Sequence, residues 1–422
     1  MNVKITPHPL SGTVRAISSK SDVHRLIIAA ALSDKPTVIK CNVRSNDIEA
    51  TVRCMSALGA DIGFIDGGIS IKPVLTPPKS ASLDCGESGS TLRFLLPVAA
   101  ALGVSAEFKG SGRLPSRPIT ALRREMEANG VNFTPPWVFP IKTEGQLKPA
   151  KYVLKGNVSS QFVTGLLIAL PLLGGDSSIR LIPPVESKSY IDMTLDTLEK
   201  FGIEITEENN VYKIKGSQKY VSPAEITADG DWSNAAFFLT AGALSGSITV
   251  TGLNINSIQG DRKVVDILAK MGAEVSVSGN NVTVKKSELH GVEIDASDIP
   301  DLIPVLSVAA ADVKSGMTTV TNAARLRIKE SDRLSAICEC INNLGVVVAE
   351  MDDGLVVWAG DGIRGGNVFG FNDHRIVMSM AIAGASSKSE VIIRGAEAVD
   401  KSYPQFFEDF KMLGGIYNVI ND

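Results

Sequence analysis

Charged and hydroxyl-bearing residues stand at the beginnings of several apolar segments of this sequence. The most concentrated group is "RLRIKESDRL", residues 325–334, in which Lys329, Glu330 and Arg333 are crowded into one short stretch. A solvated helix face would spread its charges along the helix at every third or fourth residue. Charges gathered at the mouth of an apolar segment instead indicate a site that holds negative charge.

The same arrangement recurs in both halves of the chain. Lys20, Ser21 and Arg25 begin the apolar stretch "SSKSDVHRLIIAAA", which reads as a helix. A helix N-terminus offers free N–H groups and the positive end of the helix dipole, so cations added there make an anion pocket. The cations placed in this way are Lys20, Arg25, Arg117, Lys329, Arg333, Arg375 and Lys401. We expect them to converge on one or two small ligands that carry several negative charges.

Uncharged and acidic residues accompany these cations. Gly89 in "GESGSTLR" allows close backbone approach to a ligand, with Ser90 or Thr91 expected to cap the following helix. Asp298 and Asp301 precede another apolar helix, where a carboxylate can serve as an N-cap or as a base. Helix starts of the same kind hold Ser159, Ser160 and Gln161 in "SSQFVTGLL" and Ser187 in "ESKSY". Taken singly, each stretch is at least as typical of an ordinary helix cap or exposed loop as of a ligand site.

An internal repeat provides the frame that must position these residues. Six segments share the form helix, glycine, then a strand-like run, as in "ILAKMGAEVSVSGNNVTVKK". Their glycines are Gly59, Gly130, Gly202, Gly272, Gly345 and Gly414, at successive spacings of 71, 72, 70, 73 and 69 residues. A glycine ends each helix in the left-handed conformation, and the alternating residues after it predict a β-hairpin.

One such repeat of about seventy residues cannot easily bury both of its faces, so we expect three repeats to cluster into each of two domains. The break between the third and fourth repeats falls near "VSPAEITADGDWSN", residues 221–234, with a hinge around Asp229 to Asp231. The strand-like start "MNVKITPHP" could join either domain by periodicity alone.

Composition excludes several classes of function. The chain has 422 residues, 44% hydrophobic and 21% charged, with a formal net charge of −4, which does not favour simple electrostatic binding to nucleic acid or an anionic membrane. Five cysteines without a CxxC pair argue against a disulfide framework or a zinc cluster. The N-terminus lacks the apolar core of a signal peptide, and no apolar run is long enough to span a bilayer. We therefore expect a cytoplasmic protein.

The motifs "SSKSDVHR", "GESGSTLR", "GRLPSRPI", "SSQFVTGLL", "DIPDLIPVL", "RIKESDRL", "NDHRIVM" and "KSYPQFF", in this order, resemble the 5-enolpyruvylshikimate-3-phosphate synthase family of enolpyruvyl transferases. The resemblance covers essentially the whole chain. It implies an α/β fold of two inside-out, barrel-like domains, each of three βαβαββ repeats, with the active site in the interdomain cleft. It also assigns the first strand to the C-terminal domain, so we predict domains of residues 13–229 and of 1–12 with 230–422.

The resemblance further implies transfer of the enolpyruvyl group of phosphoenolpyruvate to the 5-hydroxyl of shikimate 3-phosphate, with no metal or organic cofactor. The implied shikimate 3-phosphate ligands are Lys20, Ser21, Arg25, Ser159, Ser160, Ser187 and Lys329, with Gln161 between the two substrates. The implied phosphoenolpyruvate ligands are Lys20, Gly89, Arg117, Arg333, Arg375 and Lys401. Asp301 would act as the base, and Glu330 with Lys20 would handle the other proton transfers. We expect a monomer with no nucleic-acid or membrane partner.

Three positions depart from the residues that many members of the family carry. Glu87 stands where Asn is common, Phe94 where Pro is common and Arg325 where Asn is common. A carboxylate beside phosphoenolpyruvate would repel it, so we predict that Glu87 pairs with a cation and does not face the ligand.

Two alternative functions stay open. The sister enolpyruvyl transferase that acts on UDP-N-acetylglucosamine has the same repeats, but it resembles this chain less at "SKSDVHR" and commonly uses a loop cysteine that "GRLPSRPI" lacks. The second alternative is a binding module for single-stranded nucleic acid or RNA ends, because related repeat folds also occur in RNA-processing proteins. An aromatic content of 5% offers little stacking surface for single-stranded nucleic acid.

Overall fold

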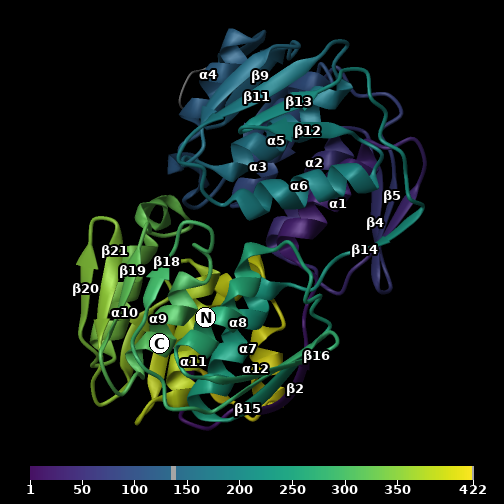
Figure 1. Ribbon diagram of the computed structural model, residues 1–422. Helices are drawn as coiled ribbons and strands as arrows, with labels where there is room; N and C mark the ends of the chain where they lie inside the picture. The colour runs from purple at the N-terminus through teal and green to yellow at the C-terminus, as the bar shows by residue number, and fades with distance from the viewer. Residues whose placement is uncertain (135–138, 421–422) are drawn as a thin grey trace. The chain divides into compact units, whose positions relative to one another are not determined.

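The computed structural model describes residues 1–134 and 139–420 and divides the chain into two compact units (Figure 1). Lys20–Ala228 forms the N-terminal unit, and Met1–Ser19 together with Asp229–Asp422 forms the C-terminal unit. The chain therefore passes between the units twice, at residues 19–20 and at 228–229. Of the predicted domain ranges, residues 135–138 and 421–422 lie outside the described part of the chain.

The division differs from the predicted boundary at residue 13. Residues 13–19 belong to the C-terminal unit, because β2 (Ser11–Arg15) pairs in parallel with β15 (Ser247–Thr251) along its whole length. The Ser19 amide also donates to the Asp229 carbonyl at 2.7 Å. Pairing across more than two hundred residues leaves no trace in the local periodicity, which is why the sequence placed this boundary too early.

The described residues of the N-terminal unit form three four-stranded sheets and six α-helices. Its helices are α1 (Lys20–Ala31), α2 (Asn46–Ala57), α3 (Gly89–Ala101), α4 (Thr120–Ala128), α5 (Ser160–Ala169) and α6 (Lys188–Lys200). Its strands are β3 (Thr37–Lys40), β4 (Asp61–Ile65), β5 (Gly68–Lys72), β6 (Ser80–Asp84), β7 (Ser105–Lys109), β8 (Val131–Thr134), β9 (Ile141–Gly145), β10 (Lys151–Lys155), β11 (Ser177–Ile182), β12 (Ile205–Glu208), β13 (Val211–Ile214) and β14 (Glu225–Thr227). The sheet orders are β14-β3-β5-β4, β6-β7-β9-β8 and β10-β11-β13-β12.

The C-terminal unit repeats this plan. Its helices are α7 (Trp232–Ser245), α8 (Val264–Lys270), α9 (Ile303–Ala311), α10 (Arg333–Asn343), α11 (His374–Ser386) and α12 (Phe406–Met412). Its other strands are β1 (Asn2–Thr6), β16 (Glu274–Ser278), β17 (Asn281–Lys285), β18 (Glu293–Asp295), β19 (Met317–Thr321), β20 (Val348–Met351), β21 (Gly354–Trp358), β22 (Gly366–Phe369), β23 (Val391–Arg394) and β24 (Ile416–Ile420). The sheet orders are β16-β17-β15-β2, β18-β19-β21-β20 and β22-β23-β1-β24.

All six sheets follow one pattern, which confirms the predicted repeats. Two parallel strands pair side by side, and the arms of an antiparallel hairpin extend the sheet, as β8 and β9 extend β6 and β7. In the sixth sheet β1 takes the place of the second hairpin arm, pairing with both β23 and β24. The first strand of the chain thus completes the last repeat, which confirms its assignment to the C-terminal unit.

The recurring glycines end helices as predicted. Gly59 follows α2 with φ of +109° and Gly272 follows α8 with φ of +101°, values that residues with a side chain rarely adopt. The other four recurring glycines also have positive φ, namely Gly130, Gly202, Gly345 and Gly414. Each repeat therefore turns from helix to hairpin at a position that glycine alone fits well.

The interior of each unit is formed by helices with almost no polar residues beyond their first turns. In the N-terminal unit α3 packs against α5, and in the C-terminal unit α7, α9 and α11 pack against one another. Every residue of α9 is buried, and α11 is buried from His374 through Ala385. Because the bodies of these helices are apolar, their polar ends carry the candidate site residues. No helix in the described part of the chain is long and apolar enough to cross a membrane.

Candidate active site

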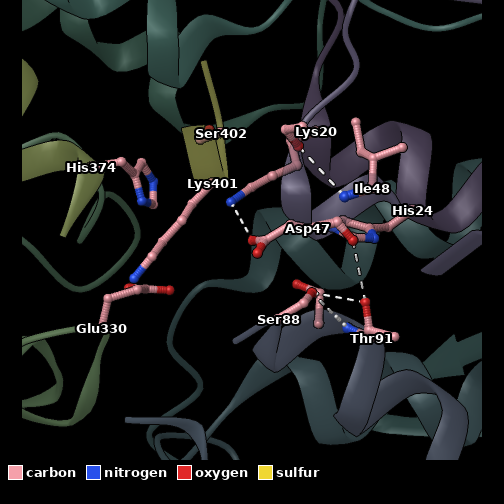
Figure 2. Close-up of polar contacts among 12 residues, drawn as sticks. Lys20, His24, Asp47, Ile48, Ser88, Thr91, Glu330, His374, Lys401 and Ser402 are labelled. Carbon is pink, nitrogen blue, oxygen red and sulfur yellow. Dashed lines mark hydrogen bonds and ion pairs between the residues drawn. The ribbon is translucent and has the colours of Figure 1, made fainter. Parts of the chain in front are cut away.

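Lys20 is the first residue of α1, as predicted, and an acidic residue holds its side chain. Its Nζ donates to Asp47 Oδ2 at 2.8 Å, and both side chains are largely buried (Figure 2). Asp47 lies in the first turn of α2, whose N-cap is Ser45. The sequence did not indicate Asp47, because only the packing of α1 against α2 brings the two charges together.

Helix α3 is capped by Ser88 and not by Ser90 or Thr91, which corrects the prediction. The Ser88 hydroxyl accepts a hydrogen bond from the Thr91 amide at 3.2 Å and one from the Thr91 hydroxyl at 2.8 Å (Figure 2). Thr91 in turn contacts the Thr51 hydroxyl at 2.6 Å, and Thr51 contacts His24 Nδ1 at 2.7 Å. Burial, together with the charges of Lys20 and Arg25, holds the pKa of His24 well below its ordinary value, so this histidine is neutral.

Gly89 begins α3 directly beneath two guanidinium groups. A Cβ atom at this position would lie 2.7 Å from Nη1 of both Arg93 and Arg117. A side chain at residue 89 would therefore displace both arginines. Arg117, predicted as an anion ligand, is only 8% exposed and ends the short 3₁₀ turn Leu114–Ser116.

Ser159, Ser160 and Gln161 lie at the N-terminus of α5, as predicted. Ser159 is the N-cap and accepts a hydrogen bond from the Gln161 amide at 3.3 Å. The Gln161 side chain accepts from Arg93 Nη1 at 2.6 Å and donates to the Ser90 hydroxyl at 3.0 Å. Arg93 was not among the predicted site residues, although its place one turn after Gly89 in "GESGSTLR" could have indicated it.

Arg25 is fully enclosed between α1 and α6. Its guanidinium donates to the Ser21 carbonyl at 2.5 Å, the Tyr190 carbonyl at 2.9 Å and the Thr194 hydroxyl at 2.9 Å. Burial lowers the pKa of Arg25 to about 10, so it stays charged at neutral pH. Ser187 precedes α6 in the left-handed conformation and does not cap the helix with its side chain.

In the C-terminal unit Arg333 is surrounded by three carboxylates. Its guanidinium contacts Asp301 at 2.7 Å, Glu330 at 2.8 Å and Asp373 at 2.8 Å, while only 1% of its side chain is exposed. Asp373 caps α11 and accepts a further bond from the Ser331 hydroxyl at 3.0 Å. The stretches 325–334 and 373–375, distant in sequence, therefore form one buried network.

Asp301 lies among three cations of this unit. It contacts Arg333 at 2.7 Å, Arg375 at 3.0 Å and Lys329 at 3.7 Å. Burial alone would raise the pKa of Asp301, but these three cations outweigh burial and hold the pKa well below its ordinary value. Burial conversely lowers the pKa of Lys329 to about 8, against the opposing charge of Asp301. Asp301 is thus ionised at neutral pH, and Lys329 is mostly protonated there, with a pKa well below that of an ordinary lysine.

Neither predicted aspartate caps α9. The N-cap position is Leu302, with Pro304 in the first turn, and Asp298 instead pairs with Lys263 at 3.4 Å. The two carboxylates before this helix therefore have different partners, and only Asp301 joins the arginine network.

Lys401 ends a short 3₁₀ helix, Ala396–Lys401, and is 8% exposed. Its Nζ donates to the Asn372 carbonyl at 2.6 Å, which ties it to the residue before Asp373. Figure 2 shows the Lys401 side chain extending toward Glu330, with His374 beside it. The C-terminal unit thus gathers Asp301, Lys329, Glu330, Arg333, Arg375 and Lys401 around the N-terminus of α11.

The three positions that depart from the family have different surroundings. The Glu87 carboxylate lies against Gly112, in the loop that also carries Arg113 and Arg117, and its predicted pairing with a cation stays a prediction. Phe94 is buried, with His24 at its edge and Arg25 over its face, ring to guanidinium 5.2 Å. Arg325 donates to the Ser297 carbonyl at 2.9 Å.

Asp261 is a buried carboxyl that the sequence did not indicate. It is 2% exposed, accepts a hydrogen bond from the Ser233 hydroxyl, and has a second oxygen without a hydrogen-bond partner among the described residues. Burial, strengthened by the negative charge of Asp301, raises the pKa of Asp261 to about 7. The residue follows "SIQG", a stretch with no charge pattern to mark it.

Asp261→Asn should change how stability depends on pH. The folded protein keeps the Asp261 proton up to about pH 7, whereas the unfolded chain loses it near pH 4, so ionisation at Asp261 destabilises the wild type as pH rises between these values. The variant lacks this titration, and its free energy of unfolding relative to wild type should therefore rise by up to about 4 kcal/mol across the interval. Urea unfolding at a series of pH values measures the difference, and a difference independent of pH would contradict the assignment.

Over the described residues these features define an α/β protein of six repeated sheets in two units, with buried cations and carboxylates at helix N-termini of each. A family model for EPSP synthase (3-phosphoshikimate 1-carboxyvinyltransferase) matches residues 5–410. The chain belongs to this family.

Individual relatives agree with the family match. The 3-phosphoshikimate 1-carboxyvinyltransferase of Clostridium novyi is 43% identical, covering 98% of this chain and 98% of the relative, and that of Clostridium acetobutylicum is 44% identical, covering 98% and 97%. The solved structure of EPSP synthase from Acinetobacter baumannii matches with a TM-score of 0.83 and 27% identity over the full length of both chains.

Proposed function

We propose that this protein transfers the enolpyruvyl group of phosphoenolpyruvate to the 5-hydroxyl of shikimate 3-phosphate, releasing phosphate, in aromatic amino acid biosynthesis. Membership of the EPSP synthase family supports this reaction. The observation that carries the chemistry is the contact of one ionised carboxylate, Asp301, with Arg333, Arg375 and Lys329. Such a cluster supplies both a proton acceptor and cations for an anionic substrate.

We assign the ligand-binding residues in two sets. The shikimate 3-phosphate set is Lys20, Ser21, Arg25, Ser159, Ser160, Ser187 and Lys329, with Gln161 between the two substrates. The phosphoenolpyruvate set is Lys20, Gly89, Arg117, Arg333, Arg375 and Lys401. Helix N-termini at Lys20, Gly89 and Ser160 favour anionic groups through their free N–H groups and dipoles.

We assign Asp301 as the base that accepts the proton of the attacking hydroxyl. A low pKa makes a carboxylate a weak base, and three cations hold the pKa of Asp301 low. An anionic substrate on Arg333 and Arg375 would offset their charge, which raises the pKa of Asp301 and strengthens it as a base when both substrates are bound. The base is therefore ionised beforehand and gains strength from the ligand itself.

Glu330 and Lys20 are assigned to the remaining proton transfers. The reaction adds a proton to the methylene carbon of phosphoenolpyruvate and must stabilise the departing phosphate. The Glu330 carboxylate is held by Arg333 at 2.8 Å, and the Lys20 ammonium by Asp47 at 2.8 Å. Each group is thus fixed in its own unit before substrate arrives.

Because the assigned ligands come from both units, we propose that the active site lies in the cleft between them and that a dianionic substrate draws the units together. Small-angle scattering should then show a smaller radius of gyration after shikimate 3-phosphate is added. A radius of gyration that stays the same on saturation with shikimate 3-phosphate would count against closure.

Lys20→Met should abolish most of the phosphate release that depends on shikimate 3-phosphate. Removing one preorganised cation from a developing negative charge typically costs roughly 100- to 1,000-fold in rate. Lys35→Met is the matched control, because Lys35 follows the same helix but is 76% exposed and outside the site. A phosphate-release assay compares both variants with wild type, and equal rates for wild type and Lys20→Met would remove Lys20 from the mechanism.

The same assay decides between the alternatives. Wild-type protein should release phosphate from phosphoenolpyruvate with shikimate 3-phosphate and not with UDP-N-acetylglucosamine. Phosphate release with the nucleotide sugar alone would move the assignment to the sister transferase. We further propose a cytoplasmic monomer, in keeping with its five free cysteines, and light scattering at assay concentration tests the monomer.

A further inference from the structure

We propose that Arg93 is a positioning residue that fixes the orientation of the Gln161 carboxamide, so that Gln161 presents its NH₂ group, and not its oxygen, as the polar contact for substrate. The proposal rests on the proposed function only in naming the substrate. The orientation itself follows from contacts within the N-terminal unit.

The carboxamide of Gln161 is held at both ends. Its Oε1 accepts a hydrogen bond from Arg93 Nη1 at 2.6 Å, and its Nε2 donates to the Ser90 hydroxyl at 3.0 Å. The opposite orientation would place the NH₂ group against the guanidinium, donor against donor. A charge-assisted bond of this length therefore selects one of the two orientations.

Arg93 is itself fixed by its surroundings. It is 4% exposed, donates through Nη2 to the Pro118 carbonyl at 3.4 Å, and lies 5.7 Å from the centre of the Phe162 ring. Its own carbonyl lies against Gly165 of α5, where an added Cβ would come within 2.4 Å. The side chain thus connects α3, α5 and the loop after Arg117, and its hydrogen bonds to Gln161 and to the Pro118 carbonyl give it a positioning role.

The orientation has a consequence for specificity. One hydrogen of the NH₂ group bonds to the Ser90 hydroxyl, and the other suits a ligand that offers an acceptor there, such as a phosphate, carboxylate or ether oxygen. A ligand with only a donor at that point would leave two donors facing each other. Arg93 therefore makes this corner of the site selective for oxygen acceptors without touching the ligand.

A double-mutant cycle tests the coupling. Arg93→Met and Gln161→Ala should each lower kcat/KM for shikimate 3-phosphate by roughly ten- to a hundredfold, and the double variant should be no worse than the more impaired single variant. Effects that multiply would overturn the proposal. Arg124→Met, an exposed arginine on α4, is the control and should match wild type. Arg93→Lys keeps the charge but has one donor group, so it should lie between wild type and Arg93→Met and provides the cycle if methionine prevents folding.

A second measurement needs no substrate and separates this inference from the proposed function. The chain has five glutamines, so ¹⁵N-glutamine labelling gives few side-chain signals, and Gln161→Ala identifies the pair from Gln161. Hydrogen exchange at that NH₂ group should be at least tenfold faster in Arg93→Met than in wild type. Unchanged exchange would overturn the positioning role even in an active enzyme. An inactive wild-type protein with the predicted exchange would overturn the reaction and leave the positioning role supported.

Discussion

Asp301→Asn is expected to lower kcat by roughly 100- to 10,000-fold, the range that a positioned general base contributes. The substitution preserves the shape of the side chain but removes its negative charge, and with it the capacity to accept a proton at neutral pH. It also leaves Arg333 and Arg375 in place to bind phosphoenolpyruvate, with less competition from a carboxylate. The loss should therefore fall on kcat, while KM for phosphoenolpyruvate stays the same or decreases.

Asp298→Asn is the matched control for this prediction. Asp298 precedes the same helix, but it pairs with Lys263 at 3.4 Å and has a side chain 38% exposed. In steady-state assays, kcat of Asp301→Asn should be at least roughly 100-fold lower than kcat of Asp298→Asn. Nearly wild-type kcat in Asp301→Asn would show that another group accepts the proton.

Arg333→Met is expected to destabilise the protein by about 3–5 kcal/mol, the usual result of removing one partner from a buried charge network. Its guanidinium contacts Asp301, Glu330 and Asp373, and Asp373 is fully buried. Without Arg333 the three carboxylates repel one another, and Asp373 loses its charged partner in an environment closed to water. Urea unfolding of the variant and of wild type at neutral pH measures the difference in free energy.

Arg327→Met is the control, because Arg327 forms comparable ion pairs with Asp332 and Glu350 while 28% of its side chain is exposed. Partly exposed pairs typically contribute about 1 kcal/mol or less. Equal losses of stability in the two variants would contradict the prediction. They would mean that other cations balance the carboxylates once Arg333 is removed. Recovery of stability in Arg333→Met at low pH, where carboxylates are protonated, would support repulsion among them as the cause.

The fold was predictable because its main signals are local and repeated. A glycine at each helix end and an alternating hairpin after it recur six times, and residues 1–134 and 139–420 form six sheets of one pattern. What escaped prediction depends on pairing between distant segments. The parallel pairing of β2 with β15 moves residues 13–19 into the C-terminal unit, and nothing in "SGTVR" itself indicates that partner.

The positions of the candidate site residues were predictable for the same reason, whereas their roles stay predictions. Charges at helix starts were visible in the sequence, and the structure brings Asp301, Lys329, Arg333 and Arg375 together in one unit. The partners that hold these residues were not visible. Asp47 and Arg93 act through contacts between helices, and nothing in the sequence around Asp261, which Arg262 and Lys263 follow, indicates that it is buried.

The most direct test of enolpyruvyl transfer follows the carbon atoms of the substrate. Phosphoenolpyruvate labelled with ¹⁴C in its three-carbon skeleton should transfer that label to shikimate 3-phosphate, with one phosphate released for each labelled product. The labelled three-carbon group should be joined to the product through an ether at the 5-hydroxyl. The yield of labelled product should fall in both Lys20→Met and Asp301→Asn, since one substitution lies in each unit. Label that stays on a three-carbon compound while phosphate is released would contradict enolpyruvyl transfer.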